Sequence, residues 1–210
     1  YWAFRAWLTS EALRFGYRVD LVDMPDLDAV KRTVRPGETK LVWIETPGNP
    51  LWTITDIAGV AEIAHGAGAA LAVDSTVATP IFTQPLKLGA DVVMHSGTKY
   101  LNGHSDVIAG VLAGADRDSS LWKRIVSLRA RHGAILGPFE AWLVYRGLET
   151  LEVRLSRMVA TAGVIAERLQ RHECVLSVRY PGLKGDPSHA IVAKQMATFG
   201  SMVVNGIPAT

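Results

Sequence analysis

The 210-residue sequence contains a single cysteine, Cys174, so it has no second thiol with which to form an intrachain disulfide. It also contains no apolar run that approaches the roughly 20 residues of a membrane-spanning helix. Its 22 basic and 20 acidic residues are interspersed and give a net charge of +2. No basic stripe is therefore available to bind nucleic acid or a membrane surface. These absences leave a small molecule or another protein as the expected ligand, and the cytoplasm as the expected location.

The first ten residues, YWAFRAWLTS, include neither a methionine nor a basic-then-apolar leader, so they are not typical of a signal peptide. Apolar residues recur at a roughly helical spacing as far as Phe15, and Gly16 interrupts the pattern. We therefore expect a helix over 1–15. We also expect the sequence to be a fragment that begins inside this helix.

Short apolar runs then alternate with helical patterns. Strands are predicted over 17–24, 40–45, 70–76, 91–96 and 107–115, with helices or helical turns over 26–34, 56–68 and 85–90. Strands that are apolar on both faces and separated by helices are typical of a largely parallel sheet covered on both sides. The predicted fold class is α/β.

The pattern becomes mainly helical after Ala115. A helix is predicted over 119–133, and a long helical region over 137–172 is expected to break near Gly147. Two further strands, in 174–185 and 198–206, belong to a smaller unit.

We therefore divide the chain into two domains. The first, 1–160, is an N-terminally incomplete large domain, and the second, 161–210, is the incomplete beginning of a C-terminal domain.

Polar residues follow three of the predicted strands at their carboxyl ends: Glu45 with Asn49, then 74–76, then 95–99. Ligands of open α/β sheets bind beyond these ends, so we expect the polar groups to converge. A carboxylate, a lysine and paired hydroxyls suit an anionic aromatic cofactor that contains nitrogen. Pyridoxal phosphate needs a lysine for its aldehyde, a carboxylate for its pyridine nitrogen and donors for its phosphate.

The stretch AVDSTVATPIFTQPLKLGADVVMHSGTKYLNGHSDVIAG, residues 72–110, resembles the Cys/Met-metabolism pyridoxal-phosphate enzymes. This family includes cystathionine γ-synthase, cystathionine γ- and β-lyases, methionine γ-lyase and O-acylhomoserine sulfhydrylases. The motifs ETPGNP, YRGLETLEVR and YPGL extend the resemblance over nearly the whole chain. The resemblance implies a fold-type I architecture: a three-layer, aspartate-aminotransferase-like large domain with a mostly parallel sheet, followed by a smaller α/β domain.

The resemblance also implies a role for each candidate residue. Lys99 would hold pyridoxal phosphate as a Schiff base and serve as the general base. Asp74 would pair with the pyridinium nitrogen, and Ser96 and Thr98 would bind the phosphate.

Three further positions follow from the same resemblance. Thr76 would lie behind the cofactor ring, and Asn49 would approach the cofactor's phenolic oxygen or the substrate carboxylate. The family's ring-stacking tyrosine corresponds to the segment YWAFR, in which Tyr1 falls one position late when Arg5 is kept in register.

Some family contacts are absent from these 210 residues. They are a Tyr/Arg pair from a neighbouring subunit, an upstream Gly-rich loop and a late arginine that binds the substrate carboxylate. The resemblance therefore implies a homotetramer, a dimer of dimers with shared active sites. We expect a chain of this extent on its own to bind cofactor poorly and to turn over nothing.

The implied reaction is elimination or replacement at Cβ or Cγ of cystathionine, homocysteine, cysteine or an O-acylhomoserine. We favour cystathionine γ-synthase or γ-lyase chemistry, because the cysteine that some methionine-degrading members carry beside the stacking tyrosine is missing. Methionine γ-lyase and O-acylhomoserine sulfhydrylase are the alternatives within the family.

Other motifs in the sequence compete with this interpretation. SGTK matches the Ser-x-x-Lys pattern of acyl-serine enzymes, with Ser96 as nucleophile, but neither Lys-Thr-Gly nor Ser-Asp-Asn occurs. The order of residues excludes a P-loop, and HGAGAALAVD lacks one glycine of a dinucleotide fingerprint. His95 and His104 do not have helical metal-ligand spacing, so no metal is predicted. An acyl-serine enzyme and a non-catalytic scaffold remain alternatives.

Overall fold

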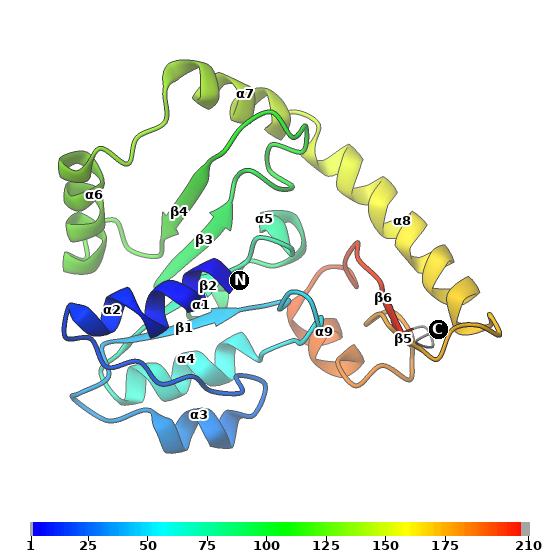
Figure 1. Cartoon of the computed structure of the whole chain (residues 1–210), viewed down its shortest axis with the longest axis horizontal. Coiled ribbons are helices and arrows are strands. Elements are labelled where there is room, and N and C mark those ends of the chain that lie inside the picture. The colour runs from blue at the N-terminus through cyan, green and yellow to red at the C-terminus, as the bar shows by residue number, and fades with distance from the viewer. Residues whose placement is uncertain (1, 207–210) are drawn as a thin grey trace.

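The computed structural model describes residues 2–206, and a four-stranded sheet lies at its centre (Figure 1). The strands β1 (Leu41–Glu45), β2 (Ala70–Asp74), β3 (Val92–Ser96) and β4 (Gly110–Gly114) are adjacent in chain order. β1, β2 and β3 are parallel, and β4 is antiparallel to β3. The predicted α/β class with a mostly parallel sheet is confirmed.

Helices α3 (Leu27–Thr33) and α4 (Ile57–Gly66) precede and follow β1. Each begins at an aspartate whose side chain accepts a hydrogen bond from a backbone N–H three residues later, Asp26 from Ala29 and Asp56 from Gly59. This capping explains where each helix begins. A short helix, α5 (Thr79–Phe82), and a 3-10 helix, η1 (Pro85–Leu88), connect β2 to β3.

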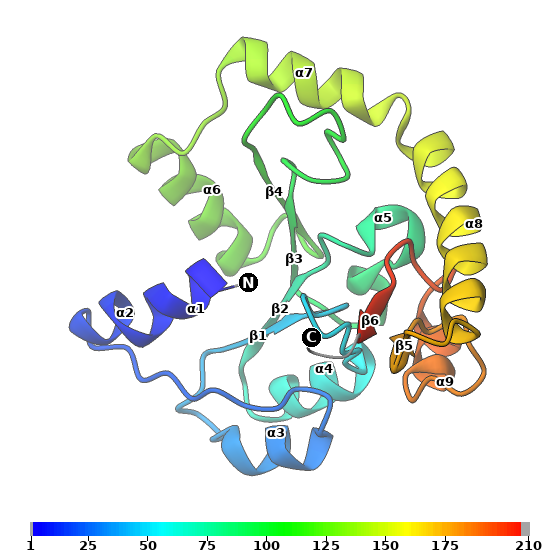
Figure 2. The ribbon, with the colours of Figure 1, turned by 45° about the vertical axis from the view of Figure 1, so that its right-hand side comes forward.

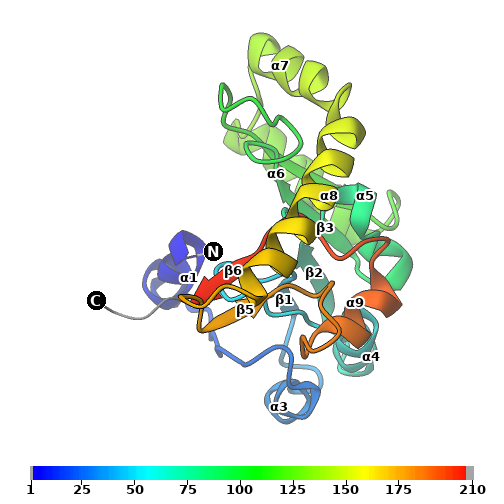
Figure 3. The ribbon, with the colours of Figure 1, turned by 90° about the vertical axis from the view of Figure 1, so that its right-hand side faces the viewer.

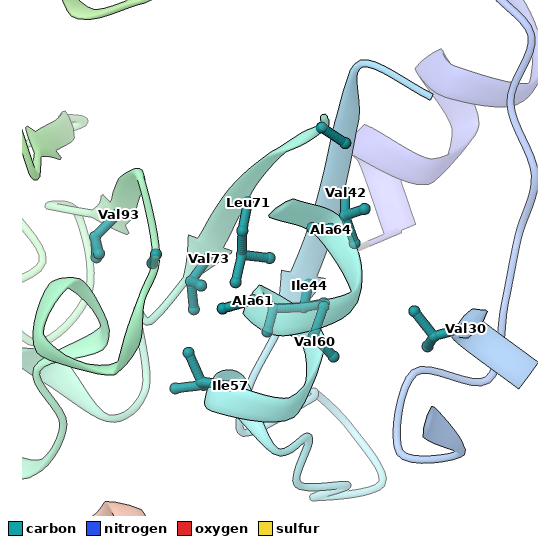
Figure 4. Close-up of a cluster of buried hydrophobic side chains, with 12 residues drawn as sticks. Val30, Val42, Ile44, Ile57, Val60, Ala61, Ala64, Leu71, Val73 and Val93 are labelled. Atoms are coloured by element: carbon teal, nitrogen blue, oxygen red, sulfur yellow. The ribbon is translucent and has the colours of Figure 1, made fainter. Parts of the chain in front are cut away.

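One face of the sheet packs against α4. Figure 4 shows Ile44, Leu71 and Val73 of the strands beside Ile57 and Val60 of this helix, all within a single buried cluster. Apolar side chains on both partners remove this face of the sheet from water and form its core.

The opposite face is covered near β1 by α1 (Trp2–Thr9). The ring of Phe4 lies 4.7 Å from that of Trp43, centroid to centroid. Because side chains alternate along a strand, Trp43 points away from the face that Val42 and Ile44 give to α4. Helices therefore lie on both sides of β1, as a three-layer arrangement requires.

Near the N-terminus, the expected helix is present with a one-residue break within the described residues, and the expected strand is absent. The helix expected over 1–15 ends at Thr9 and resumes as α2 (Glu11–Arg14), and the Ser10 hydroxyl between them donates to the carbonyl of Ala6 at 2.7 Å. Residues 17–24 form no strand. The side chains of Val22 and Met24 are half-buried, because they pack against the core cluster between the sheet and helices α3 and α4.

The outer helices form an arc around the sheet (Figures 1 and 2). They are α6 (Ser120–His132), α7 (Pro138–Leu148) and α8 (Leu151–Gln170). Gly133 ends α6 with a φ of 70°, as its position in the sequence indicates. The expected break near Gly147 is confirmed and falls between α7 and α8.

The last part of the chain forms a small unit beside the second half of α8 (Figure 3). It contains β5 (Ser177–Arg179) and β6 (Val204–Gly206), which pair antiparallel, and α9 (His189–Gln195), a helix that the sequence pattern did not reveal. Within residues 2–206, no helix combines the length and apolar character needed to cross a membrane.

The small unit is fastened to the start of α4. The side-chain amide of Gln195 accepts from the Ile57 N–H at 3.2 Å and donates to the Thr55 carbonyl at 3.0 Å. Beside it, the Lys194 ammonium lies 2.9 Å from Asp56.

Candidate active site

The polar residues predicted at the strand ends meet at one edge of the sheet. Glu45 is opposite Asp74 in the β1–β2 register, and Asp74 is opposite Met94, two residues before β3 ends at Ser96. The antiparallel β4 begins at the same edge, where Gly110 is opposite Ser96.

A chain of hydrogen bonds joins the ends of β2 and β3. The Thr76 hydroxyl donates to Oδ1 of Asp74 at 2.6 Å, and the Thr76 N–H donates to the same oxygen at 3.0 Å. The backbone N–H of Ser96 then donates to the Thr76 hydroxyl oxygen at 2.8 Å. Thr76 therefore fixes the carboxylate relative to the end of β3.

The Asp74 carboxyl is buried, with 7% of the residue exposed. Burial raises its pKa above the usual aspartate range, because desolvation outweighs the two hydrogen bonds from Thr76 that lower it, and the nearby Glu45 adds to the rise. A buried acid in this state favours a cationic partner, which would restore the ionised form.

His95, on the same strand end, is also buried, and its Nδ1 lies 3.1 Å from the Ser75 carbonyl. Desolvation lowers its pKa. A neutral imidazole held against a backbone carbonyl agrees with the structural interpretation of this residue.

Lys99 lies in a compact turn directly after β3. Its N–H donates to the Ser96 carbonyl at 3.1 Å, and its carbonyl accepts from the N–H of Gly103 at 2.7 Å. The N–H of Asn102 donates to the Gly97 carbonyl at 3.0 Å and closes the turn. Lys99 itself is exposed. A continuous path of hydrogen bonds therefore runs from Asp74 through Ser96 to the backbone of Lys99.

Thr98 is tied to the start of β4. Its hydroxyl accepts from the N–H of Ala109 at 2.9 Å and donates to the Ala109 carbonyl at 3.3 Å. To donate to a phosphate, the hydroxyl would exchange this long second contact for the new acceptor. Ser96 beside it is half-buried.

Of the two remaining candidates, Asn49 makes no hydrogen bond to this path among the described residues. Asn49 lies exposed in the loop after β1, and its N–H donates to the Glu45 carboxylate at 3.1 Å. Tyr1 lies outside the described residues.

Sequence reasoning missed Arg154. Its guanidinium donates to the carbonyl of Tyr100, the residue after Lys99, at 3.0 Å. The motif YRGLETLEVR contains this arginine, but nothing in its local spacing indicates a partner 54 positions earlier in the chain.

The residues at this edge fit pyridoxal phosphate by their chemistry. The buried Asp74 carboxylate suits a protonated ring nitrogen, the exposed Lys99 amine suits an aldehyde, and hydroxyls and backbone N–H groups around Ser96 suit a phosphate. Among the described residues, no group of three His, Cys, Asp or Glu side chains could hold a metal ion.

The fold and this edge define an α/β protein with a cofactor site beyond the carboxyl ends of parallel strands. The sequence model of a family described as Cys/Met metabolism PLP-dependent enzyme, where PLP is pyridoxal phosphate, matches residues 1–208. The chain belongs to that family.

Characterised relatives include several activities. The chain is 48% identical over 190 residues to a cystathionine gamma-synthase from Mycobacterium tuberculosis, covering 90% of this chain and 48% of that protein. It is 44% identical over 200 residues to an L-methionine gamma-lyase from Treponema denticola, covering 94% of this chain and 49% of that protein. The chain thus spans about half the length of the curated relatives it matches.

Solved structures agree with the fold. The cystathionine gamma-lyase of Lactobacillus plantarum, in complex with L-serine, superposes with a TM-score of 0.92 at 38% identity, covering 97% of this chain and 53% of that one. An apo methionine gamma lyase from Micromonospora echinospora gives a TM-score of 0.91 at 41% identity, covering 97% and 55%. At these identities the neighbours support family membership as well as architecture.

Proposed function

We propose that this chain is the cofactor-binding part of a pyridoxal-phosphate enzyme that carries out elimination or replacement on a sulfur-containing amino acid. The observation that carries the proposal is the buried Asp74 carboxylate, joined through Thr76 and Ser96 to the turn that holds Lys99. When bound, the cofactor supplies an electron-withdrawing ring that stabilises negative charge at the substrate's Cα.

Each residue at the edge has a distinct task in this proposal. Asp74 keeps a proton on the ring nitrogen, and Thr76 holds the carboxylate in place for it. Lys99 would hold the cofactor through its aldehyde, and its amine would move the proton of the substrate's Cα. Ser96 and Thr98 bind the phosphate with N–H groups of the turn.

Two further assignments complete the proposed site. Asn49 approaches the substrate side of the cofactor, since its loop follows β1 at the same edge. Tyr1 is proposed to stack on the ring.

We favour cystathionine γ-synthase or γ-lyase chemistry, in which cystathionine is the product of the synthase and the substrate of the lyase. Cystathionine gamma-synthases are among the relatives, at 48% identity, and the segment YWAFR lacks the cysteine of some methionine-degrading members. Methionine γ-lyase remains the second candidate, because a methionine gamma-lyase is 44% identical over a longer span.

We also infer a domain boundary at 160/161. Leu151 and Leu155 of α8 pack with Phe82 and Leu101 of the large unit, whereas Ala162 and Ala166 of the same helix pack with residues of the small unit. The two halves of α8 thus belong to different hydrophobic clusters.

A homotetramer, working in the cytoplasm with active sites shared between subunits, completes the proposal. Exposed aromatic residues on α7, including Phe139 and Tyr145 at 63% and 64%, provide apolar surface for contact between subunits. Sedimentation of the full-length protein would give the number of subunits.

The test of the cofactor assignment uses the full-length protein. We expect it to be yellow, borohydride to fix the colour covalently, and peptide mapping to place the label on Lys99. Lys99→Ala should abolish the label. It should also lower kcat by about 10²- to 10⁴-fold, the usual contribution of a general base. A label on another lysine, or no visible band after cofactor is added, would refute the assignment.

Lys87→Ala is the matched control, because Lys87 is an exposed lysine on the connection between β2 and β3. It should retain both colour and turnover. Asp74→Ala should lower turnover far more than cofactor occupancy, and Ser96→Ala should mainly weaken occupancy. The reverse ranking would show that the two roles are exchanged.

A further inference from the structure

Arg154, in the first turn of α8, links three segments of the chain. Its Nη1 donates to the Tyr100 carbonyl at 3.0 Å, its Nη2 to the Gly147 carbonyl at 2.9 Å, and its Nε to the Thr150 hydroxyl at 3.0 Å. The planar guanidinium can make all three bonds at once because its donors point in fixed, divergent directions. One side chain thus joins the α7–α8 corner to the turn that follows β3.

The contact between corner and turn leaves no room for a side chain on either glycine that faces it. A Cβ on Gly103, which has a φ of 71°, would overlap Nη1 of Arg154. A Cβ on Gly147 would overlap the backbone carbonyl of Asn102. The guanidinium of Arg154 therefore lies directly against Gly103. The α7–α8 corner, at Gly147, lies directly against the neighbouring residue Asn102.

The three acceptors of Arg154 are two carbonyls and a hydroxyl, not carboxylates. The guanidinium is half-buried, and this burial lowers the Arg154 pKa. A partly desolvated charge that is held by backbone carbonyls serves to fix the backbone it binds.

Besides Arg154, other groups hold the turn: Thr98 hydrogen-bonds to Ala109, and the Asn102 side-chain amide donates to Asp106, both on the segment that leads into β4. The turn's internal bonds run from Lys99 to Ser96, from Asn102 to Gly97 and from Gly103 to Lys99. Leu101 is buried against Leu151 and Leu155 of α8. The polar attachment through Arg154 and the apolar attachment through Leu101 therefore come from the same helix, within two of its turns.

We propose that Arg154 is a positioning residue for Lys99: its guanidinium holds the 97–103 turn against the α7–α8 corner, so that the lysine amine is presented at the cofactor aldehyde. This inference rests on the proposed function, in which Lys99 bonds to pyridoxal phosphate. Arg154 contacts neither substrate nor cofactor in this scheme.

The test uses the full-length protein carrying Arg154→Gln or Arg154→Lys, with Arg157→Gln as control. Arg157 is one turn further along the same helix, and it is exposed. Hydrogen exchange is measured on the cofactor-free proteins. We expect Arg154→Gln to speed exchange of the Asn102 and Gly103 amides about 10- to 100-fold, the usual effect of losing a hydrogen bond from a charged group. Exchange in β2 and α4 should not change.

The cofactor arm measures what the turn does for Lys99. In Arg154→Gln, the dissociation constant for pyridoxal phosphate should rise about tenfold and kcat should fall by a similar factor, with KM for cystathionine little changed. Arg154→Lys restores the charge and one donor, and it should recover part of both losses. Arg157→Gln should match the wild type.

Three results would overturn the inference. They are unchanged exchange of the 97–103 turn in Arg154→Gln, exchange that rises equally in β2 and α4, and a cofactor dissociation constant and kcat equal to those of the wild type. Failure of the proposed function looks different, because the wild-type protein would then carry no borohydride label on Lys99 while the exchange result still reported whether Arg154 holds the turn.

Discussion

The sheet core and the helices α6 and α7 both contain many apolar residues, but they bury these residues to different extents. Twelve buried residues gather where β1, β2 and β3 meet α3 and α4. By contrast, α6 has no buried residue, and α7 buries only Val144 and Gly147. The sheet core is thus buried within the described chain, while the apolar side chains of α6, and those of α7 other than Val144, remain at least partly exposed.

This difference shows that apolar residues have two roles in the sequence. Apolar residues of the core specify the fold, since their burial removes them from water inside the same chain. Exposed apolar surface on α6 and α7 marks a region suited to contact with another surface. The candidate site lies at the edge of the core, and the α7–α8 corner, in the middle of the arc, contacts it through Arg154.

The strongest test of the comparison removes one leucine from each region of the full-length protein. Leu71 is fully buried in β2, whereas Leu128 on α6 is 43% exposed. Leu71→Ala should lower the free energy of unfolding by about 2–5 kcal/mol, because it leaves a cavity in the core. Leu128→Ala should lower it by less than about 1 kcal/mol. Denaturant titration measures both, and equal losses would mean that α6 is as deeply buried in the assembled protein as the sheet.

The next test compares two glycines with nearly the same backbone conformation. Gly103 in the 97–103 turn has a φ of 71° and faces Arg154. Gly133 at the end of α6 has a φ of 70° and open space around it. Gly133→Ala should cost about 1–2 kcal/mol, the penalty of the left-handed conformation alone. Gly103→Ala should cost about 2–4 kcal/mol, because the added methyl also displaces the guanidinium.

Thermal or denaturant unfolding of the two glycine variants provides the measurement. The excess cost of Gly103→Ala should shrink when Arg154 is already replaced by glutamine. An excess that stays the same in that background would show that the guanidinium is not what limits the space at Gly103.

The smallest effect expected concerns the charge of Asp74. Burial raises the folded pKa of this carboxyl above its unfolded value, so its contribution to stability is present below the unfolded pKa and is lost as pH rises through the folded pKa. Ionisation of Asp74 in the folded, cofactor-free protein therefore costs free energy, and this cost lowers the stability of that protein as pH rises. Asp74→Asn should raise its melting temperature at pH 7, and the gain should disappear towards about pH 4 as the wild-type acid becomes protonated.

Asp118→Asn is the control for that experiment, because this aspartate before α6 has a side chain that is 80% exposed. A hydrated carboxylate has little to gain from neutralisation, so its variant should follow the wild type. A gain at Asp74 that does not depend on pH would assign the effect to packing instead of charge.

Much of the fold could be predicted from the sequence because burial leaves a local pattern. β1, β2 and β3 each appear in the sequence as a continuous apolar run, and the predicted bounds agree to within two residues. Capping residues likewise identified α6, where Ser119 accepts from Trp122 at the start and Gly133 ends the helix. These signals are local, and they need no knowledge of distant contacts.

The errors have a different physical origin. Residues 17–24 have the composition of a strand, but Val22 and Met24 pack against the edge of the core cluster without pairing with a strand. Composition does not distinguish these two ways of covering apolar side chains. The short α9 depends on contacts with the start of α4, made by Gln195 and Lys194. Such tertiary contacts override local preference.

The candidate site shows the same division. The order of Asp74, Ser96 and Lys99 along the chain, at the ends of adjacent strands, was enough to predict that they share an edge. The bridging role of the Thr76 hydroxyl and the hold of Arg154 on the lysine turn were not predictable, because they depend on where side chains separated by 20 and 54 positions come to lie.

The bridge formed by Thr76 has a spectroscopic consequence. Its hydroxyl touches the acid on one side and the amide of Ser96 on the other, so any change in the ionisation of Asp74 reorients a dipole against that amide. The chemical shift of the Ser96 amide nitrogen, at the end of β3, should therefore change when Asp74 gains or loses its proton. It would report the protonation of the buried acid without an attached probe.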